Sequence, residues 1–467
     1  MTLLCTLLLA STLTSAPCDT SLRWRRMGEV KVCLPQSPAN AVVFLLAGDD
    51  GWTPMMQQIA NVLVGEGALV AGIETRPFLR RLDVAQERCA YPAADFESLS
   101  QYLQLQHHLP QYQEPLLVGY SSGAALAYAT AEQAPAHIFK GVISLGFYAE
   151  LKTGKPWCYE HGLLKLDKTA KRARLVPDLI GKFPWRVIQG GADTLCDPTK
   201  AEAFVAQVPQ ARFVRVPGET HSLTAAYLPP LLVAVHELLG AAPIHPPPSD
   251  PSVGDLPLVE VPAVGTEYAD TLAIILSGDG GWASIDKEVA AELARRGIAT
   301  VGISSLKYFW QARTPESTAQ DIARVAAHYG ALWHRSKLLL LGYSFGADVM
   351  PFVFNRLPEA LQQQVTLVAL LAPTATAEFE FHVSDWLGGD SKSARPTAPE
   401  LAKLQAVRVL CLQGEAEQAL NCSGAPQGKN VTLPGGHHFD GNYAALTRLV
   451  LNELSQAATP HNSRMQP

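Results

Sequence analysis

The sequence predicts two tandem α/β domains, each with a mostly parallel β-sheet and helices on both faces. Two observations predict this fold class. Short apolar runs, typical of buried strands, alternate with amphipathic stretches typical of helices, and such alternation favours a parallel sheet. Segments from the first half of the chain then recur in the second half. Internal repetition of this kind indicates a duplicated domain.

Four segments of the first copy have a counterpart in the second, and their order is kept. The pairs are VVFLLAGDDGW (42–52) with LAIILSGDGGW (272–282), GYSSGAALAYA (119–129) with GYSFGADVMPF (342–352), VIQGGAD (187–193) with CLQGEAE (411–417), and VPGETHS (216–222) with LPGGHHF (433–439). A shared order over four segments excludes a chance match of one motif. The chain therefore carries two copies of one layout.

Each copy contains the same series of expected elements. Strands in the first copy are expected at residues 42–47, 68–73, 115–119, 141–145, 185–189 and 212–216. Helices between them are expected near 54–64, 95–108, 122–133, 199–207 and 223–239. The second copy repeats the strands at 272–276, 299–303, 337–342, 365–371, 407–412 and 430–433. Ligands of such folds bind at the carboxyl ends of the strands, so each site is expected there.

Composition changes mark the domain boundaries. A Pro-rich segment at 241–259 favours a semi-rigid linker between the copies. We therefore expect an N-terminal domain at 19–240, a C-terminal domain at 260–456 and a flexible tail at 457–467.

The apolar N-terminus, residues 1–16, ends in small residues and is too short to span a membrane. It predicts a signal peptide and export, with a buried N-terminal segment as the alternative.

Charge and cysteine content narrow the class of protein. Hydrophobic residues make up 48% of the 467 residues, the formal net charge is −6, and no long run of Lys or Arg occurs. This excludes a disordered chain and a nucleic-acid partner.

Two disulfide pairs are expected, Cys158 with Cys196 and Cys411 with Cys422, although buried reduced cysteines are the alternative. No metal-binding or cofactor-binding motif occurs, so neither a metal nor a cofactor is expected.

A Gly-x-Ser-x-Gly pentapeptide follows a predicted strand and precedes a predicted helix in both copies. It is centred on Ser121 in the first copy and on Ser344 in the second. This pattern is the nucleophile elbow of α/β-hydrolases, in which a tight turn exposes the serine at a helix N-terminus. We therefore expect two α/β-hydrolase-like domains.

An acid and a histidine should follow the serine, in that order. Asp193 and His221 satisfy the order in the first copy and form a candidate second triad with Ser121. In the second copy Glu417 is in register with Asp193, counted from the preceding glycine, and Glu415 is the alternative.

Two adjacent histidines compete for the place of the base in the second copy. Counting from the shared Pro-Gly pair aligns His438 with His221, whereas a Gly-His-x-Phe pattern favours His437. We expect His438 and keep His437 as the alternative.

Several residues are expected to contact the substrate in the second copy. The amide of Phe345, and that of Gly280 or Gly281 in the loop after the first strand of this copy, are the expected oxyanion donors. Asp279, Trp282 and Asp286 are expected at the cleft rim. Asp348 lies one helical turn beyond Ser344. It is either a carboxylate favoured by the helix dipole or an anchor for a cationic substrate group.

The second copy resembles a known family. The segments ILSGDGGW, LGYSFGADVMPFVFNRLP, FEFHVSDWLGG and PGGHHFDGNY are similar to the VirJ/AcvB family of bacterial virulence proteins, in which the AcvB type carries both copies. The resemblance implies a periplasmic serine hydrolase, linked to virulence or envelope homeostasis, that removes lysine from lysyl-phosphatidylglycerol. Its partner would be an aminoacylated phospholipid at the periplasmic membrane face, reached by peripheral contact.

Charge pairing with the lysyl group is a further hypothesis from the residues. Asp348, Asp279 or Asp385 would hold its ammonium groups. Two other functions remain open from the sequence. One is a soluble carboxylesterase for small esters, and the other is a non-catalytic periplasmic partner of a secretion or envelope system.

Overall fold

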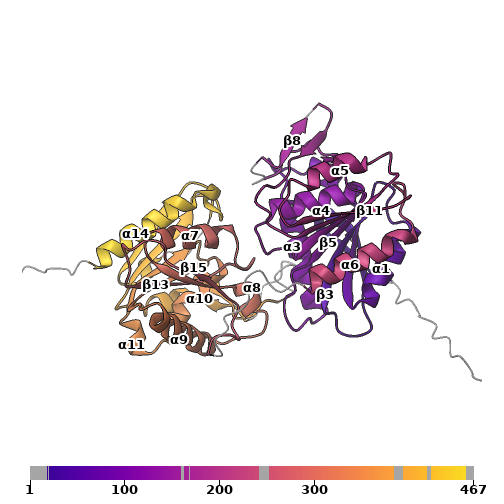
Figure 1. The fold of residues 1–467 in the computed structure, drawn as a ribbon. Helices are drawn as coiled ribbons and strands as arrows, with labels where there is room; N and C mark the ends of the chain where they lie inside the picture. The colour runs from indigo at the N-terminus through magenta and orange to yellow at the C-terminus, as the bar shows by residue number, and fades with distance from the viewer. Residues whose placement is uncertain are drawn as a thin grey trace, which may run out of the picture. The chain divides into compact units, whose positions relative to one another are not determined.

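The structure, a computed structural model, forms two compact units with one large sheet each (Figure 1). Its described residues are 18, 20–158, 162–167, 169–240, 252–382, 393–417 and 422–458. The expected signal peptide, most of the expected tail and Asp385 lie outside these residues. Within the described part, no helix combines the length and the apolar character that crossing a bilayer needs.

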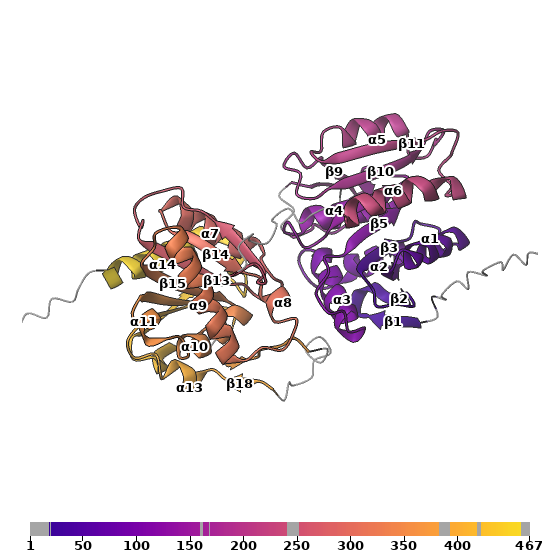
Figure 2. The same cartoon turned by 60° about the horizontal axis from the view of Figure 1, so that its bottom comes forward.

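The first unit is built on an eight-stranded sheet. The strand order is β1 (Thr20–Trp24), β2 (Gly28–Cys33), β4 (Ala68–Ile73), β3 (Ala41–Leu46), β5 (Leu116–Tyr120), β6 (Gly141–Leu145), β10 (Trp185–Gly190) and β11 (Ala211–Val216). Figure 2 shows this order from β1 at one edge to β11 at the other. β2 pairs antiparallel with β1 and β4, and all other neighbours are parallel. All six expected strands are present.

Helices cover both faces of the first sheet. They are α1 (Pro54–Gly65), α2 (Thr75–Val84), α3 (Pro92–Gln106), α4 (Ser122–Gln133), α5 (Pro198–Val205) and α6 (Leu228–Leu239). Val43 and Leu45 of β3 pack in one layer with α1 and α6. Phe44 points to the opposite face and meets Phe96 of α3 edge-on, with ring centroids 5.2 Å apart. Alternate residues of one strand therefore fill both layers, which explains its continuous apolar sequence.

The second unit repeats this architecture with seven strands. The order is β12 (Leu258–Val261), β14 (Ala299–Ile303), β13 (Thr271–Leu276), β15 (Lys337–Tyr343), β16 (Val365–Leu371), β19 (Arg408–Gly414) and β20 (Gly428–Leu433). Among these strands β12 alone is antiparallel to its neighbour. Its helices are α7 (Ser284–Arg295), α8 (Ser305–Tyr308), α9 (Pro315–Leu332), α10 (Phe345–Phe354), α11 (Glu359–Gln362), α13 (Ala398–Leu401) and α14 (Tyr443–Ala458).

The core of the second unit also lies on both faces of its sheet. Ile274 of β13 packs in the layer of α9 and α10, while its neighbour Ile275 packs in the layer of α7 and α14 (Figure 1). Two small sheets accompany the large ones. They are β7 (Glu150–Leu151) with β9 (Arg172–Leu175) and β8 (Leu164–Asp167), and β17 (Thr376–Ala377) with β18 (Arg395–Pro396).

The segment expected to be a linker is partly core. β12 begins at Leu258, inside the expected linker 241–259, and Val253 and Leu256 are buried. Burying such apolar side chains stabilises the fold, so this end of the segment belongs to the second unit. Residues 241–251 lie outside the described part of the chain.

Three disulfides join cysteines of the described residues. They are Cys18–Cys33, Cys89–Cys158 and Cys411–Cys422. The predicted pairing of Cys411 with Cys422 is confirmed. The predicted pairing of Cys158 with Cys196 is wrong, because Cys158 is bonded to Cys89 and Cys196 is buried as a free thiol.

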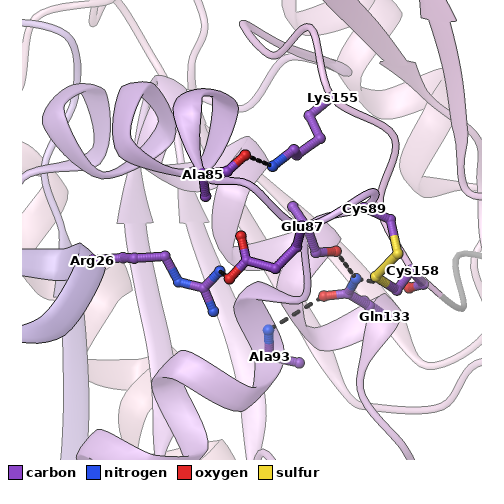
Figure 3. The surroundings of a disulfide bond; sticks show 9 residues. Arg26, Ala85, Glu87, Cys89, Ala93, Gln133, Lys155 and Cys158 are labelled. Atoms are coloured by element: carbon purple, nitrogen blue, oxygen red, sulfur yellow. Dashed lines mark hydrogen bonds and ion pairs between the residues drawn. A yellow bond between two sulfur atoms is a disulfide. The ribbon is translucent and has the colours of Figure 1, made fainter. Parts of the chain in front are cut away.

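Backbone contacts explain why Cys158 meets Cys89. Ala90 and Trp157 form a parallel bridge, and the Cys158 amide donates to the Ala90 carbonyl over 2.9 Å. Figure 3 shows Gln133 between the two segments, with its Nε2 donating to the carbonyls of Ala90 (3.0 Å) and Cys158 (2.8 Å). These bonds bring two segments that are distant in sequence together, so the sequence spacing gave no hint of the pair.

Candidate active site

Both predicted nucleophiles lie on a strained turn between a strand and a helix. Ser344 joins β15 to α10 with φ 51° and ψ −118°, and Ser121 joins β5 to α4 with φ 54° and ψ −118°. A positive φ is costly for a residue with a side chain and is found where the surrounding fold enforces it. The turn presents each hydroxyl at the carboxyl edge of its sheet, as a nucleophile elbow does.

Close packing requires the two glycines that flank Ser344. A Cβ atom on Gly342 would lie 2.3 Å from the Gly346 carbonyl oxygen. A Cβ atom on Gly346 would lie 2.1 Å from the Leu276 carbonyl oxygen. Both distances are far inside van der Waals contact, so a larger residue at either position would open the turn.

In the second copy the structure brings together Ser344, His437 and Glu417. His437 Nε2 lies 2.8 Å from Ser344 Oγ, and His437 Nδ1 lies 2.6 Å from Glu417 Oε1. With its proton on Nδ1, the imidazole donates to Glu417 and accepts from the serine hydroxyl. Glu415, the alternative acid, is exposed on the same loop. The geometry is that of a nucleophile, its base and an orienting acid.

The expectation that His438 faces the nucleophile is wrong. Its Nδ1 lies 2.9 Å from the Tyr343 hydroxyl, and its side chain is exposed. His437 occupies the place next to Ser344 instead.

The reason is a one-residue difference between the histidine loops of the two copies. A Cβ on Gly190 would lie 2.4 Å from the Thr220 carbonyl oxygen, and a Cβ on Gly414 would lie 2.4 Å from that of Gly436. Thr220 and Gly436 therefore occupy equivalent places, and the residue after each is the histidine that meets the serine. The second copy has one residue fewer between the Pro-Gly pair and this histidine. Counting from the Pro-Gly pair therefore pointed one residue too far, to His438.

The first copy contains an equivalent arrangement. His221 Nε2 lies 3.0 Å from Ser121 Oγ, and His221 Nδ1 lies 2.9 Å from Asp193 Oδ2. The Asp193 side chain is fully buried. It also accepts from the amides of Leu195 (2.9 Å) and Cys196 (2.7 Å) and, over 3.0 Å, from a glutamine side chain at the end of β10. The candidate second triad thus has its three members in hydrogen-bonding order.

Asp193, Cys196 and His221 also lie within 4.8 Å of one another, which is close enough to share a metal ion. Two observations argue against that use. His221 Nδ1 and Asp193 Oδ2 are hydrogen-bonded to each other. Burial raises the pKa of the Cys196 thiol to about 12, whereas a metal ligand must be a thiolate. The cluster fits a hydrogen-bonded triad better than a metal site.

A tyrosine that the sequence analysis overlooked supports each histidine. Tyr120 donates to the backbone carbonyl of His221 over 3.0 Å, and Tyr343 donates to that of His437 over 3.2 Å. Burial raises the pKa of Tyr120 to about 12, so its hydroxyl remains a donor. The signal was present in the sequence, because tyrosine directly precedes the serine in both copies.

The glycine amides expected as oxyanion donors in the second copy are engaged within their own loop. The Gly281 amide donates to the Gly278 carbonyl over 3.1 Å, and the Gly280 amide donates to Asp279 Oδ1 over 3.0 Å. The loop itself is well placed, since a Cβ on Gly278 would lie 3.6 Å from the Ser344 Cβ.

Two other amides suit the oxyanion better. For the Asp279 amide the described structure shows no protein acceptor. The Phe345 amide is the first of α10, where N–H groups have no partner within the helix. An oxyanion at this helix N-terminus would also meet the positive end of the helix dipole.

Asp348 is buried beside Ser344 and is held by Thr374. Its carboxylate accepts from the Thr374 amide and, over 2.9 Å, from the Thr374 hydroxyl. Burial, together with the nearby charge of Asp279, raises the pKa of Asp348 to about 7. This carboxyl therefore orders the loop after β16, one helical turn from Ser344.

Trp282 does not stand free at the cleft rim. A Cβ on Gly302 would lie 2.1 Å from its ring, so the indole lies flat against β14. Its partly buried ring joins the core layer of α7 and α14.

Comparison with known protein families identifies the family to which this chain belongs. The model for the bacterial virulence protein VirJ matches residues 40–189 and 270–458, well over half of the chain. The chain belongs to the VirJ family. Both copies contribute to the match, so this VirJ protein is a tandem one. A search of curated proteins found no match.

Solved structures similar to this VirJ chain are distant. One is Est1E from Butyrivibrio proteoclasticus, with 15% identity and a TM-score of 0.32 over 42% of this chain and 93% of that one. Two others are an α/β serine hydrolase homologue from Coxiella burnetii (17%, 0.28, 47% and 94%) and an α/β serine hydrolase without a lid from Xanthomonas campestris (18%, 0.29, 47% and 91%). At these values they carry no argument about substrate. The strand order and the two elbows define the tandem α/β-hydrolase fold.

Proposed function

We propose that the second copy is a periplasmic serine hydrolase that removes an aminoacyl group, of the lysyl type, from a phospholipid headgroup. The observation that carries the proposal is the hydrogen-bonded series Ser344–His437–Glu417 beside two carboxylates, Asp279 and Asp348. The series supplies the ester chemistry, and the carboxylates supply a preference for a cationic acyl group.

The chemistry follows from the two hydrogen bonds of His437. Ser344 Oγ attacks the ester carbonyl while His437 Nε2 takes its proton, and Glu417 stabilises the imidazolium that results. The amides of Asp279 and Phe345 are suited to hold the oxyanion. The glycerol oxygen leaves with the proton from His437. Water then cleaves the acyl-enzyme by the same route and releases the amino acid.

Charge explains why a lysyl ester is the preferred substrate class. A lysyl group brings two ammonium groups close to the ester, and opposite charges at short range favour each other. Asp279 is exposed in the loop beside Ser344 and forms no salt bridge with a described cation. Asp348 has a pKa raised to about 7, and a bound ammonium would draw it towards its charged form.

The test measures amino acid release from vesicles that contain lysyl-phosphatidylglycerol or, as an uncharged-side-chain comparison, alanyl-phosphatidylglycerol. The mature protein should release lysine faster, Ser344→Ala should release none, and Ser121→Ala should match the wild type. Asp279→Asn should lower the lysyl-to-alanyl preference by about 5-fold, the size of one partly exposed ion pair.

Three outcomes would contradict the proposal. Lysine release that survives Ser344→Ala would place the reaction elsewhere. Cleavage of p-nitrophenyl esters without cleavage of either lipid would indicate a carboxylesterase for small esters. Inactivity in both assays would indicate a binding role.

A further inference from the structure

The first copy retains the complete triad and the strained elbow of a hydrolase site. Its two triad distances, 3.0 and 2.9 Å, match the 2.8 and 2.6 Å of the second copy closely. Ser121 also keeps the positive φ of a nucleophile, a strained conformation that a glycine would relieve. The retained strain and the buried acid indicate a site in use.

Two positions near this serine are uncharged where the second copy has a carboxylate and its hydrogen-bond donor. Ala125 lies in α4, in the part of the helix that corresponds to Asp348 in α10. Tyr148 follows β6 by the same number of residues as Thr374 follows β16. An alanine and a tyrosine therefore stand where the second copy has a carboxylate and its partner.

The loop before the first helix of this copy carries two carboxylates, Asp49 and the exposed Asp50, and Asp49 is paired. Asp49 corresponds to Asp279 in the loop before the first helix, and a Cβ on its neighbour Gly48 would lie 3.2 Å from the Ser121 Cβ. Asp49 accepts a hydrogen bond from Lys152 Nζ. Partial burial alone would raise the pKa of Asp49, but Lys152 and the charge of Arg76 lower it below its usual value.

We propose that Ser121, His221 and Asp193 form a second, independent esterase site, which takes esters whose acyl group carries no positive charge. In the first copy, Asp49 corresponds to Asp279 and is paired with Lys152, and Ala125 takes the place of Asp348. A cationic acyl group would meet Lys152 beside Asp49, where the second copy has Asp279 without a paired cation among the described residues. The two copies would thus divide ester substrates by the charge of the acyl group.

The reaction needs only water as a co-reactant. Ser121 Oγ forms a bond to the ester carbonyl carbon and gives its proton to His221 Nε2. The bond from that carbon to the alcohol oxygen breaks, and the alcohol leaves with the proton. Water repeats the sequence on the acyl-enzyme, and the free acid is released.

Covalent labelling of the full-length mature protein tests whether the site is active. A fluorophosphonate reacts with activated serines, and peptide mass spectrometry locates the adduct. Ser344→Ala should still be labelled on Ser121, Ser121→Ala only on Ser344, and His221→Ala should lose the Ser121 adduct. Labelling confined to Ser344 in the wild type, with no adduct on Ser121 in any variant, would overturn the proposal.

A matched pair of esters tests the charge preference in the Ser344→Ala protein. p-Nitrophenyl hexanoate and its ω-amino counterpart differ in one ammonium group. The hexanoate should be cleaved with at least about 10-fold higher kcat/KM, a difference of about 1.4 kcal/mol. Lys152→Met removes the ion pair of Asp49 and should narrow this ratio several-fold, while Lys140→Met, a control at a half-buried lysine on the loop before β6, should leave it unchanged.

An equal or reversed preference would overturn the proposed substrate class. The labelling locates each adduct by residue, and the ester assay contains no lipid and no active Ser344. Their failure is therefore distinct from failure of the lysyl-lipid proposal for the second copy.

Discussion

Replacing His437 and His438 by alanine, one at a time, tests which of two adjacent histidines acts with Ser344. His437 forms hydrogen bonds to both the serine and Glu417. Loss of a triad base typically lowers kcat by about 10⁴- to 10⁶-fold, or about 5–8 kcal/mol in the activation free energy. We expect a loss of this size for His437→Ala.

The substitution His438→Ala should lower kcat much less than His437→Ala does. Its hydrogen bond to the Tyr343 hydroxyl is a neutral one at an exposed side chain, and such a bond contributes about 1 kcal/mol. Tyr343 would keep its second bond, to the His437 carbonyl. We therefore expect a rate loss below about 10-fold and an unchanged fold.

The assay is the kcat for a p-nitrophenyl ester, measured in a Ser121→Ala background so that the first copy does not contribute. Thermal unfolding of each variant provides the control for folding. A loss above about 100-fold in His438→Ala, with His437→Ala still active, would refute the assignment and restore the register that the shared Pro-Gly pair suggested.

Three further predictions concern stability. Burial raises the pKa of Asp286 to about 7, so the folded state keeps this proton up to a higher pH than the unfolded state does. The Tm of the wild type should therefore fall from pH 5 to pH 8, and the Tm of Asp286→Asn should fall less. Removing the Cys89–Cys158 disulfide, whose partners are 69 residues apart, should lower the unfolding free energy by about 4 kcal/mol in denaturant titrations, and a loss below about 1 kcal/mol would contradict this. Gly302→Ala should displace the Trp282 ring, shift its fluorescence and cost about 1–3 kcal/mol, whereas an unchanged spectrum and stability would show that the ring can move freely.

The sequence predicted those features that short stretches of chain determine. The buried strands show as continuous apolar runs, and the elbow at Ser344 shows as two glycines that close packing requires. Strands β1 and β2 were missed, because charged residues alternate with apolar ones along them and leave no apolar run.

Contacts between segments that are distant in sequence could not be predicted from the sequence. The partner of Cys158 depends on a backbone bridge near Cys89, which no spacing rule reports. The choice between His437 and His438 depends on a one-residue deletion that only the packing of Gly414 against the loop reveals. The engagement of Asp348 by Thr374 likewise joins α10 to a loop that lies well beyond it in sequence.

Comparison of the two copies separates what holds the site together from what chooses the substrate. Positions whose backbone is tightly packed agree: each copy has its strained serine, its flanking glycines and a tyrosine that donates to the histidine carbonyl. Positions whose side chains surround the serine differ, as Ala125 and Asp348 do. Steric constraint leaves the first group no freedom, whereas the second group can change charge without disturbing the turn. A duplicated hydrolase can therefore acquire a second specificity while its reaction geometry stays fixed, and the exchange of Asp348 for Ala125 is an example of that freedom.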